Sequence, residues 1–221
     1  MHSLQQGLHN MEMLDIFDEN HNHIGVCEKK EVHQKGLWHQ VFACLLIDSK
    51  KNKVYLQYKS SKHNDVSTLN KIDISVGGHL SAGETIEDGV REIEEEAGLK
   101  VTYEQLIPVG MRLIDKYINE NYIIREFSYL HIYDSEFDLN DLKSQDDEVL
   151  YFIEFDIDEL IAYLTNEKDT IGGLTPTGYK TFERDDFIQA YIGDDRLYLK
   201  YLLLAKQVIN KEQDISWKNF H

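Results

Sequence analysis

Apolar residues in the first third of the chain come in short runs separated by polar turns, which is the pattern of β-strands. Residues 14–17 and 24–27 form two such runs around a polar turn, and they predict a hairpin. Residues 37–47 are mostly apolar and aromatic, and residues 54–58 alternate apolar and polar side chains. These two segments predict central strands, and residues 72–76 predict a further strand.

The pattern changes after residue 76, where a glycine pair is predicted to end the strand sharply. Residues 85–97 then have the composition of a helix. Thr85 and Asp88 form a capping pair at its start, and Gly98 supplies a stop at its end. This segment is therefore predicted to be a helix.

The second half mixes both patterns. Strands are predicted at residues 105–114, 122–133 and 149–155, helices at 158–167 and 182–210, and a linker at 172–178. This order predicts an α+β fold, a sandwich whose mixed sheet is covered by helices.

The chain is predicted to divide into three parts. Residues 1–13 are a flexible lead, 14–165 the main domain, and 166–221 a linker with a helical C-terminal extension. The extension is expected to pack on the main domain through an apolar stripe. The stripe consists of Leu197, Tyr201, Leu204 and Val208.

Charge narrows the classes of partner. The chain has 221 residues, with 40 Asp and Glu against 23 Lys and Arg, and a formal net charge of −17. The negative electrostatic potential of such a chain repels phosphate backbones and anionic bilayers, so we expect neither a nucleic-acid duplex nor a membrane as partner. The sequence does not predict an oligomeric state.

Cysteine usage indicates the compartment. Cys27 and Cys44 are too few for a disulfide framework and lack the spacing of a zinc knuckle. No apolar run approaches the roughly eighteen residues needed to cross a bilayer. We expect a cytoplasmic protein.

Candidate chemistry lies in the predicted helix. Glu92, Glu95 and Glu96 stand at i, i+3 and i+4, so three carboxylates project from one helical face. Oxygen ligands at this density suit a hard cation such as Mg²⁺ or Mn²⁺. Arg91 could pair with one carboxylate and fix its rotamer. An acidic, solvated helix is the alternative.

Together with the residues around them, these glutamates resemble the signature of the Nudix hydrolase superfamily. The pattern is Gly-x5-Glu-x7-Arg-Glu-apolar-x-Glu-Glu-x-Gly-apolar, and it is matched by Gly78, Glu84, Arg91, Glu92, Ile93, Glu95, Glu96, Gly98 and Leu99. Six residues separate Glu84 from Arg91 where the family has seven. We expect the junction of loop and helix to absorb this difference, which puts the role of Glu84 in question.

The resemblance implies a Nudix-type α/β/α sandwich that cleaves a nucleoside diphosphate linked to another moiety. It implies that Glu92, Glu95 and Glu96 bind catalytic Mg²⁺, with Mn²⁺ as a possible substitute. The catalytic residues would be Arg91, Glu92 and Glu95. Gly78 is a predicted substrate contact.

Other segments resemble the Nudix branch related to isopentenyl diphosphate isomerase. His33, His39 and His79 fall where that isomerase collects an imidazole-rich metal site, with Glu126 near its later acidic positions. The isomerase carries a cysteine two residues before the histidine, and this chain has Gly77 there. Its proton-transfer chemistry is therefore not expected. The histidines either share a metal or cap and pack within the fold.

Three further residues are weaker candidates. Glu126 and Glu148 could each supply a late carboxylate that completes the metal site, or could face solvent. Lys59, at the end of a predicted strand, could reach a substrate phosphate or simply face water.

The sequence therefore predicts a metal-dependent pyrophosphohydrolase with a small-molecule diphosphate substrate. An isomerase of isoprenoid diphosphates and a noncatalytic nucleotide sensor are the alternatives. Substrate specificity is expected to come from residues 60–71 and 115–122, whose sequence does not reveal the leaving group.

Overall fold

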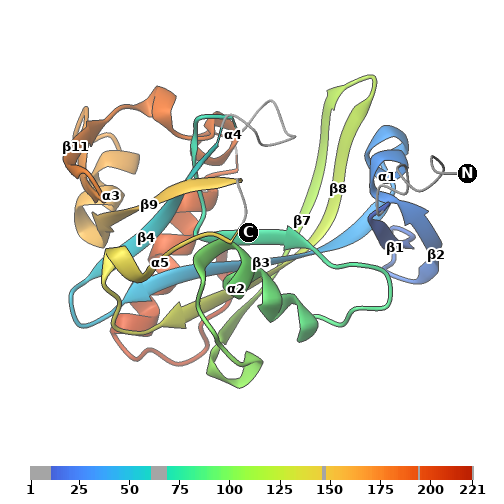
Figure 1. Cartoon of the computed structure of the whole chain (residues 1–221), viewed down its shortest axis with the longest axis horizontal. Coiled ribbons are helices and arrows are strands. Elements are labelled where there is room, and N and C mark those ends of the chain that lie inside the picture. Colours follow the sequence, from blue (N-terminus) through green and yellow to red (C-terminus); the bar gives the residue numbers. More distant parts are fainter. Residues whose placement is uncertain (1–10, 61–68, 146–147, 194, 221) are drawn as a thin grey trace, which may run out of the picture. The chain divides into compact units, whose positions relative to one another are not determined.

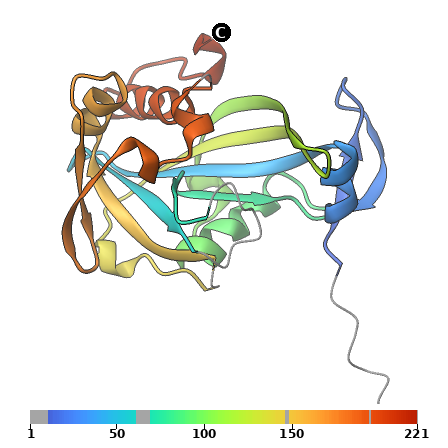
Figure 2. The same cartoon turned by 90° about the horizontal axis from the view of Figure 1, so that it is seen from above.

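The computed structural model describes residues 11–60, 69–145, 148–193 and 195–220. The chain forms two compact units. Figures 1 and 2 show its helices and strands, coloured along the sequence. The smaller unit comprises Met1–Phe42, Gly78–Gly89 and Arg112–Tyr129, and the larger comprises Ala43–Gly77, Val90–Met111 and Leu130–His221. Of the predicted lead, residues 1–10 lie outside the described residues, and Met13 is the first residue of strand β1.

The described elements follow each other in a mixed order. The strands are β1 (Met13–Phe17), β2 (His23–Glu28), β3 (Trp38–Asp48), β4 (Lys53–Lys59), β5 (Ile72–Asp73), β6 (Val76–His79), β7 (Ile107–Asn119), β8 (Tyr122–Asp134), β9 (Val149–Asp156), β10 (Ile171–Thr175) and β11 (Gly178–Phe182). The α-helices are α1 (Lys29–Lys35), α2 (Arg91–Ala97), α3 (Ile157–Leu164), α4 (Gln189–Ile192) and α5 (Leu197–Ile209). Short 3₁₀ turns include η1 (Asp88–Val90), η2 (Tyr103–Gln105), η3 (Leu139–Asp141), η4 (Arg184–Asp186) and η5 (Trp217–Phe220).

The smaller unit is built on the predicted N-terminal hairpin. Strands β1 and β2 pair antiparallel, and β1 also pairs with the start of β3, where Ile16 lies opposite His39. The sequence did not predict α1, which follows β2 directly and ends at Gly36. These contacts place α1 and the beginning of β3 in the same unit.

The larger unit contains the sheet order β11-β10-β9-β4-β3. Strand β4 pairs with β9 along its whole length, but it pairs with β3 only at Leu46–Asp48. Beyond that point β5 pairs with β4 and β6 pairs with β3. The hydroxyl of Ser75 fills the split: it accepts a hydrogen bond from the Leu46 N–H and donates one to the Tyr55 carbonyl.

This split corrects one prediction. Residues 72–76 were expected to form one strand ended by a glycine pair, but Ile74 and Ser75 interrupt it, and Gly77 and Gly78 lie inside β6. The interruption lies where the chain passes from pairing with β4 to pairing with β3, and the Ser75 hydroxyl bonds to both of these strands there.

Helices α3 and α5 cover one face of the larger unit's sheet (Figure 2, where α5 is red). In α5 the predicted stripe is present, since Leu197, Tyr201 and Leu204 are buried and Val208 packs against the same core. The core also contains residues of β3, β4 and β9. The C-terminal segment is thus part of the larger unit's core, while the predicted boundary at residue 165 stays a prediction.

The segment 172–178 was predicted to be a linker, and this is wrong. It belongs to an antiparallel hairpin of β10 and β11, in which β10 also pairs with β9 (Figure 1). Glycines are used there for close approach: a Cβ at Gly173 would lie 2.6 Å from Ile153, and one at Gly172 would collide with the Tyr179 ring. Glycine therefore marks tight packing here and not a flexible connection.

Two predicted helices are shorter than expected. The helix predicted at 85–97 begins only at Arg91, because Thr85 and Asp88 bond to each other in a turn that continues into η1. The segment 182–210 contains the end of β11, η4 and α4 before α5 begins at Leu197. In these two segments composition identified the helices but not their starts, whereas the helix predicted at 158–167 is α3, which starts at Ile157.

Candidate active site

Helix α2 is fixed in the larger unit at both its inner face and its end. Ile93 and Ala97 are fully buried. Gly98 adopts a left-handed conformation with φ 72° and closes the helix as predicted. The last turn is then tied to the following segment, since the N–H of Lys143 donates to the Ala97 carbonyl at 3.0 Å. The helix thus offers a rigid base for its glutamates.

Arg91 joins two of the predicted site carboxylates. Its Nη1 donates to Glu92 Oε1 at 2.7 Å and to Glu95 Oε2 at 3.0 Å. Burial raises the pKa of Glu92 to about 8, an effect that the charge of Arg91 opposes and the charges of Glu96 and Glu95 reinforce. A cation near this group would stabilise the ionised carboxylate.

Glu96 is held by two other donors. Lys59 Nζ lies 3.0 Å from Glu96 Oε1, and the Gly77 N–H donates to Oε2 at 2.8 Å. Burial raises the pKa of Glu96, and Lys59 and Gly77 oppose that rise. Burial alone would lower the pKa of Lys59, but the nearby carboxylates of Glu96 and Asp73 outweigh burial and raise it. The short contact between these two buried side chains forms an ion pair.

The oxygen donors of α2 are of the kind that a hard divalent cation prefers. In this structure the glutamates are paired with Arg91 and Lys59. Groups of three or more Asp, Glu, His or Cys side chains whose ligand atoms all lie within 4.8 Å of one another are candidate metal sites. Among the described residues, one such group occurs, and it consists of three histidines. The carboxylate set fits Mg²⁺ in its chemistry, and binding would require these side chains to exchange some of their present contacts.

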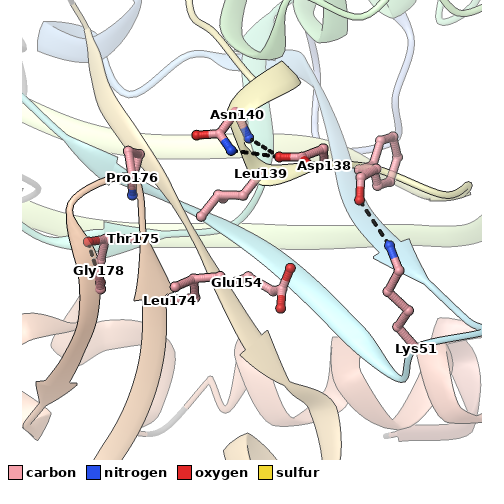
Figure 3. A pocket seen from close by; sticks show the side chains of 10 residues that line it. Lys51, Asp138, Leu139, Asn140, Glu154, Leu174, Thr175, Pro176 and Gly178 are labelled. Carbon is pink, nitrogen blue, oxygen red and sulfur yellow. Dashed lines mark hydrogen bonds between the residues drawn. The ribbon is translucent and has the colours of Figure 1, made fainter.

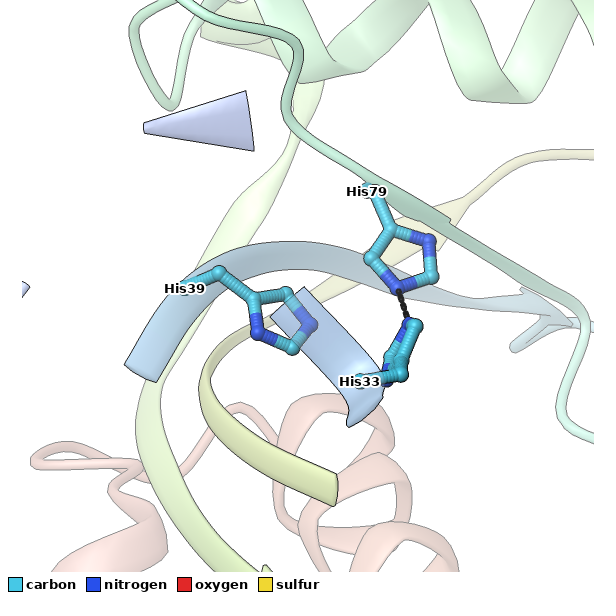
Figure 4. Close-up of side chains that lie close together, drawn as sticks. All are labelled: His33, His39 and His79. Carbon is cyan, nitrogen blue, oxygen red and sulfur yellow. Dashed lines mark hydrogen bonds between the residues drawn. The ribbon is translucent and has the colours of Figure 1, made fainter. Parts of the chain in front are cut away.

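The histidine group lies in the smaller unit and joins His33 of α1, His39 of β3 and His79 of β6 (Figure 4). His33 Nε2 is 3.2 Å from His79 Nε2, and Glu126 Oε1 is 3.7 Å from His39 Nε2. The Tyr122 ring stacks on His33 with centroids 4.7 Å apart. The structure thus brings together the three histidines that the sequence singled out, with Glu126 beside them.

His39 has the protonation state and the available ring nitrogen that a metal ligand requires. Burial lowers its pKa to about 4, so the ring is neutral near pH 7. Its Nδ1 lies 3.0 Å from the Leu37 carbonyl, and an N–H there leaves the Nε2 lone pair available. His39 Nε2 is buried and has no hydrogen-bond partner. These features fit a metal ligand better than a packing residue.

The remaining predicted residues have mixed positions. Gly78 lies in β6. Glu84 accepts a hydrogen bond from the Ser81 N–H at 2.7 Å and so closes its own loop. The backbone carbonyl of Glu148 accepts a hydrogen bond from the Ser60 N–H. The charge of the Glu148 side chain contributes to the raised pKa of Lys59. Residues 146–147 and 61–68, which include most of one predicted specificity segment, lie outside the described residues.

Sequence reasoning did not single out Asp73, and it included Tyr122 only as the last residue of the predicted specificity segment 115–122. Asp73 lies opposite Gln57 in the β4–β5 pair, and its charge contributes to the raised pKa values of Lys59 and Glu96. Tyr122 begins β8 and stacks on His33. The signal for both is strand pairing and ring packing, which residue spacing does not contain.

A cavity of about 500 Å³ also opens in the larger unit (Figure 3). Lys51, Asp138, Glu154 and Thr175 are among its lining residues. Lys51 Nζ donates to the Phe137 carbonyl, and Asp138 accepts from Asn140. The described lining includes none of the residues that the sequence predicted for the site.

Comparison with known proteins places this geometry in a family. Residues 37–173 match the model of the NUDIX domain. The chain belongs to the Nudix hydrolase family. It is 34% identical over 204 residues to an uncharacterized Nudix hydrolase of Clostridium acetobutylicum, covering 87% of this chain and 97% of that protein.

Two other comparisons refine the relationship. The chain is 27% identical to isopentenyl-diphosphate Delta-isomerase 2 of Photorhabdus laumondii, over 58% of this chain and 68% of that enzyme. The crystal structure of DR0079 from Deinococcus radiodurans matches with a TM-score of 0.53 and 19% identity, covering 70% of this chain and 89% of the other. They confirm the predicted Nudix sandwich and the branch related to the isomerases.

Proposed function

We propose that this Nudix hydrolase cleaves the diphosphate linkage of a nucleoside diphosphate derivative with water, in a reaction that depends on Mg²⁺ or Mn²⁺. The observation that carries the proposal is the bridging contact of Arg91 with Glu92 and Glu95 on α2. A noncatalytic sensor has no need for a guanidinium that orients two carboxylates, so this contact favours an enzyme over a sensor.

Four charged residues of α2, Arg91, Glu92, Glu95 and Glu96, have roles in this proposal. When bound, the cation neutralises diphosphate oxygens and lowers the pKa of an attacking water. Glu92, Glu95 and Glu96 would supply the oxygen ligands. Burial raises the pKa of Glu92 to about 8, and a bound cation would offset that rise and favour the ionised ligand. Arg91 holds Glu92 and Glu95 in place, and Gly78 stays a predicted substrate contact.

The proposal is tested with a panel of nucleoside diphosphates, dinucleoside polyphosphates and nucleotide sugars, each assayed with Mg²⁺ and with Mn²⁺. We expect phosphate-containing products from at least one member, and none without a divalent cation. Turnover that persists in excess chelator would contradict the metal dependence, and the absence of product across the panel would contradict the substrate class.

The histidine group supports a second candidate, an isomerase-like reaction at a metal held by His33, His39 and His79, with Glu126 as a fourth ligand. The thiol that the related isomerases use is missing, because position 77 is glycine and its N–H is engaged by Glu96. Cys44 is fully buried, and burial raises its pKa. We therefore rank this candidate second, and rearrangement of isopentenyl diphosphate is its test.

The expected location and substrate of the protein are not tested by the structure. Among the described residues, no helix has the length and apolar character of a bilayer span. The cytoplasmic location and the small-molecule diphosphate substrate stay predictions.

A further inference from the structure

Lys59 and Glu96 form an ion pair in the interior of the larger unit. Lys59 is the last residue of β4, and Glu96 lies on α2, 37 positions later in the chain. Their charged atoms are 3.0 Å apart, and their side chains are only 4% and 5% exposed. The backbone of Lys59 is also fixed, since its N–H donates to the Lys71 carbonyl. The ammonium group therefore has a defined place beside Glu96.

This pair sets the orientation of the Glu96 carboxylate. Lys59 engages Oε1 while the Gly77 N–H engages Oε2 at 2.8 Å. Two donors on two different oxygens fix both the rotamer and the plane of the carboxylate. Each oxygen has a second lone pair, so a cation can share an oxygen that already accepts a hydrogen bond. Glu96 is thus held in one orientation and can still coordinate a cation.

Burial argues against a direct role for Lys59 at the substrate. A lysine that binds phosphate acts as a point charge at an accessible position. The Lys59 ammonium is enclosed and 3.0 Å from Glu96 Oε1, and the charge of Asp73 helps to raise its pKa. Moving it to a phosphate would leave the buried Glu96 carboxylate with the Gly77 N–H but without its charged partner, which is unfavourable.

We propose that Lys59 is a positioning residue, which holds Glu96 in the orientation that binds the divalent cation and does not contact the substrate phosphate. This inference rests on the proposed function in that Glu96 is taken as a ligand. It adds a residue outside the helix motif to the groups that determine metal affinity.

The test is a double-mutant cycle read by Mn²⁺ binding to the full chain without substrate. Wild type, Lys59→Met, Glu96→Gln and the double variant are titrated with Mn²⁺ and followed by electron paramagnetic resonance. We expect each single change to weaken Mn²⁺ binding by about tenfold or more, as loss of a group that orients a ligand does. The double variant should bind no more weakly than Glu96→Gln alone, because Lys59 acts only through Glu96.

Two variants complete the design. Lys59→Arg keeps the charge and should retain Mn²⁺ affinity within about threefold of wild type. Lys53→Met is the matched control, since Lys53 lies on the same strand and is 3.5 Å from Asp156, outside the α2 site. It should leave Mn²⁺ binding unchanged. Circular dichroism verifies folding, and Lys59→Gln, which keeps an N–H donor, replaces Lys59→Met in the cycle if the latter does not fold.

Wild-type Mn²⁺ affinity in Lys59→Met, with a raised KM for the diphosphate substrate, would overturn the inference and make Lys59 a phosphate ligand. Additive losses of Mn²⁺ affinity in the double variant would also overturn it. With Lys59→Gln in place of Lys59→Met, unchanged Mn²⁺ affinity has the same meaning. A chain that binds Mn²⁺ as expected but hydrolyses no substrate would instead contradict the proposed function alone.

Discussion

Arg91 and Glu92 are neighbours in the sequence, and their side chains are joined by a hydrogen bond of 2.7 Å from Nη1 to Oε1. The same Nη1 reaches Glu95 one helical turn further on, at 3.0 Å. A single guanidinium thus fixes two carboxylates of α2 relative to each other. This arrangement links the residue spacing of the Nudix family pattern to a specific contact in this chain.

Glu95→Gln should abolish most activity and leave the fold intact. The change removes a ligand charge, and we expect kcat to fall by about 100-fold or more. The Glu95 and Arg91 side chains are 48% and 31% exposed, so their ion pair contributes only about 0–1 kcal/mol to the free energy of unfolding.

Glu94→Gln is the control for this change, because Glu94 lies on the same helix and its Oε1 is 3.6 Å from Lys100 Nζ. Its kcat should match that of the wild type. Near-full turnover of Glu95→Gln at saturating metal would show that Glu95 is not a ligand.

Gly98→Ala should destabilise the protein strongly. A left-handed conformation costs a residue with a side chain about 1–2 kcal/mol, and a Cβ at Gly98 would also lie 2.6 Å from the Lys143 carbonyl oxygen. Gly83→Ala separates the two effects, since Gly83 has a similar φ of 86° but nothing within 4 Å of a Cβ. Chemical denaturation should show Gly98→Ala to be worse by at least about 1 kcal/mol. Equal losses would refute the proposed close contact.

The hydroxyl of Tyr201 should stabilise the larger unit. It donates to the His131 carbonyl at 2.8 Å and accepts from the His131 N–H at 3.1 Å, in a fully buried position. Tyr201→Phe leaves these backbone groups without that partner, which should lower the free energy of unfolding by about 1–3 kcal/mol. Tyr179→Phe, at a residue 74% exposed, should change it by less than about 0.5 kcal/mol. Indistinguishable variants would mean that α5 is held by apolar packing alone.

The histidine group should bind a transition metal through nitrogen. Co²⁺ added to the wild-type chain should produce the visible absorption of a site with imidazole ligands. His79→Asn should weaken Co²⁺ binding by about tenfold or more, since it removes one of three ligands. His23→Asn is the control, because His23 is exposed and pairs with Asp15. Unchanged Co²⁺ affinity in His79→Asn would assign the histidines to packing.

Much of the fold follows from local patterns. The apolar run at 37–47 and the alternation at 54–58 identified the central strands to within one residue at each end, and Gly98 ended α2 as expected. The hairpin at β10 and β11 did not follow, because Gly172 and Gly173 have the composition of a linker. These glycines are needed because Tyr179 and Ile153 pack closely against them, and this packing exists only in the folded state.

The candidate site divides in the same way. Spacing on a helix was enough to place Glu92, Glu95 and Arg91 within reach of one another. The position of Lys59 was not predictable, since its contact with Glu96 depends on how α2 packs against β4. The sequence suggested a lysine facing a substrate or water, whereas the structure has it buried beside a carboxylate.

The reaction itself is the central claim, and oxygen-18 water tests it most directly. A hydrolase places one water oxygen in a phosphate product, whereas an isomerase moves a proton between carbons and leaves the diphosphate intact. Mass spectrometry of the products from the nucleotide panel and from isopentenyl diphosphate distinguishes the two. We predict label in one phosphate product of at least one nucleoside diphosphate derivative and no rearranged isoprenoid. Rearranged isoprenoid without labelled phosphate from any nucleotide would contradict the hydrolase assignment.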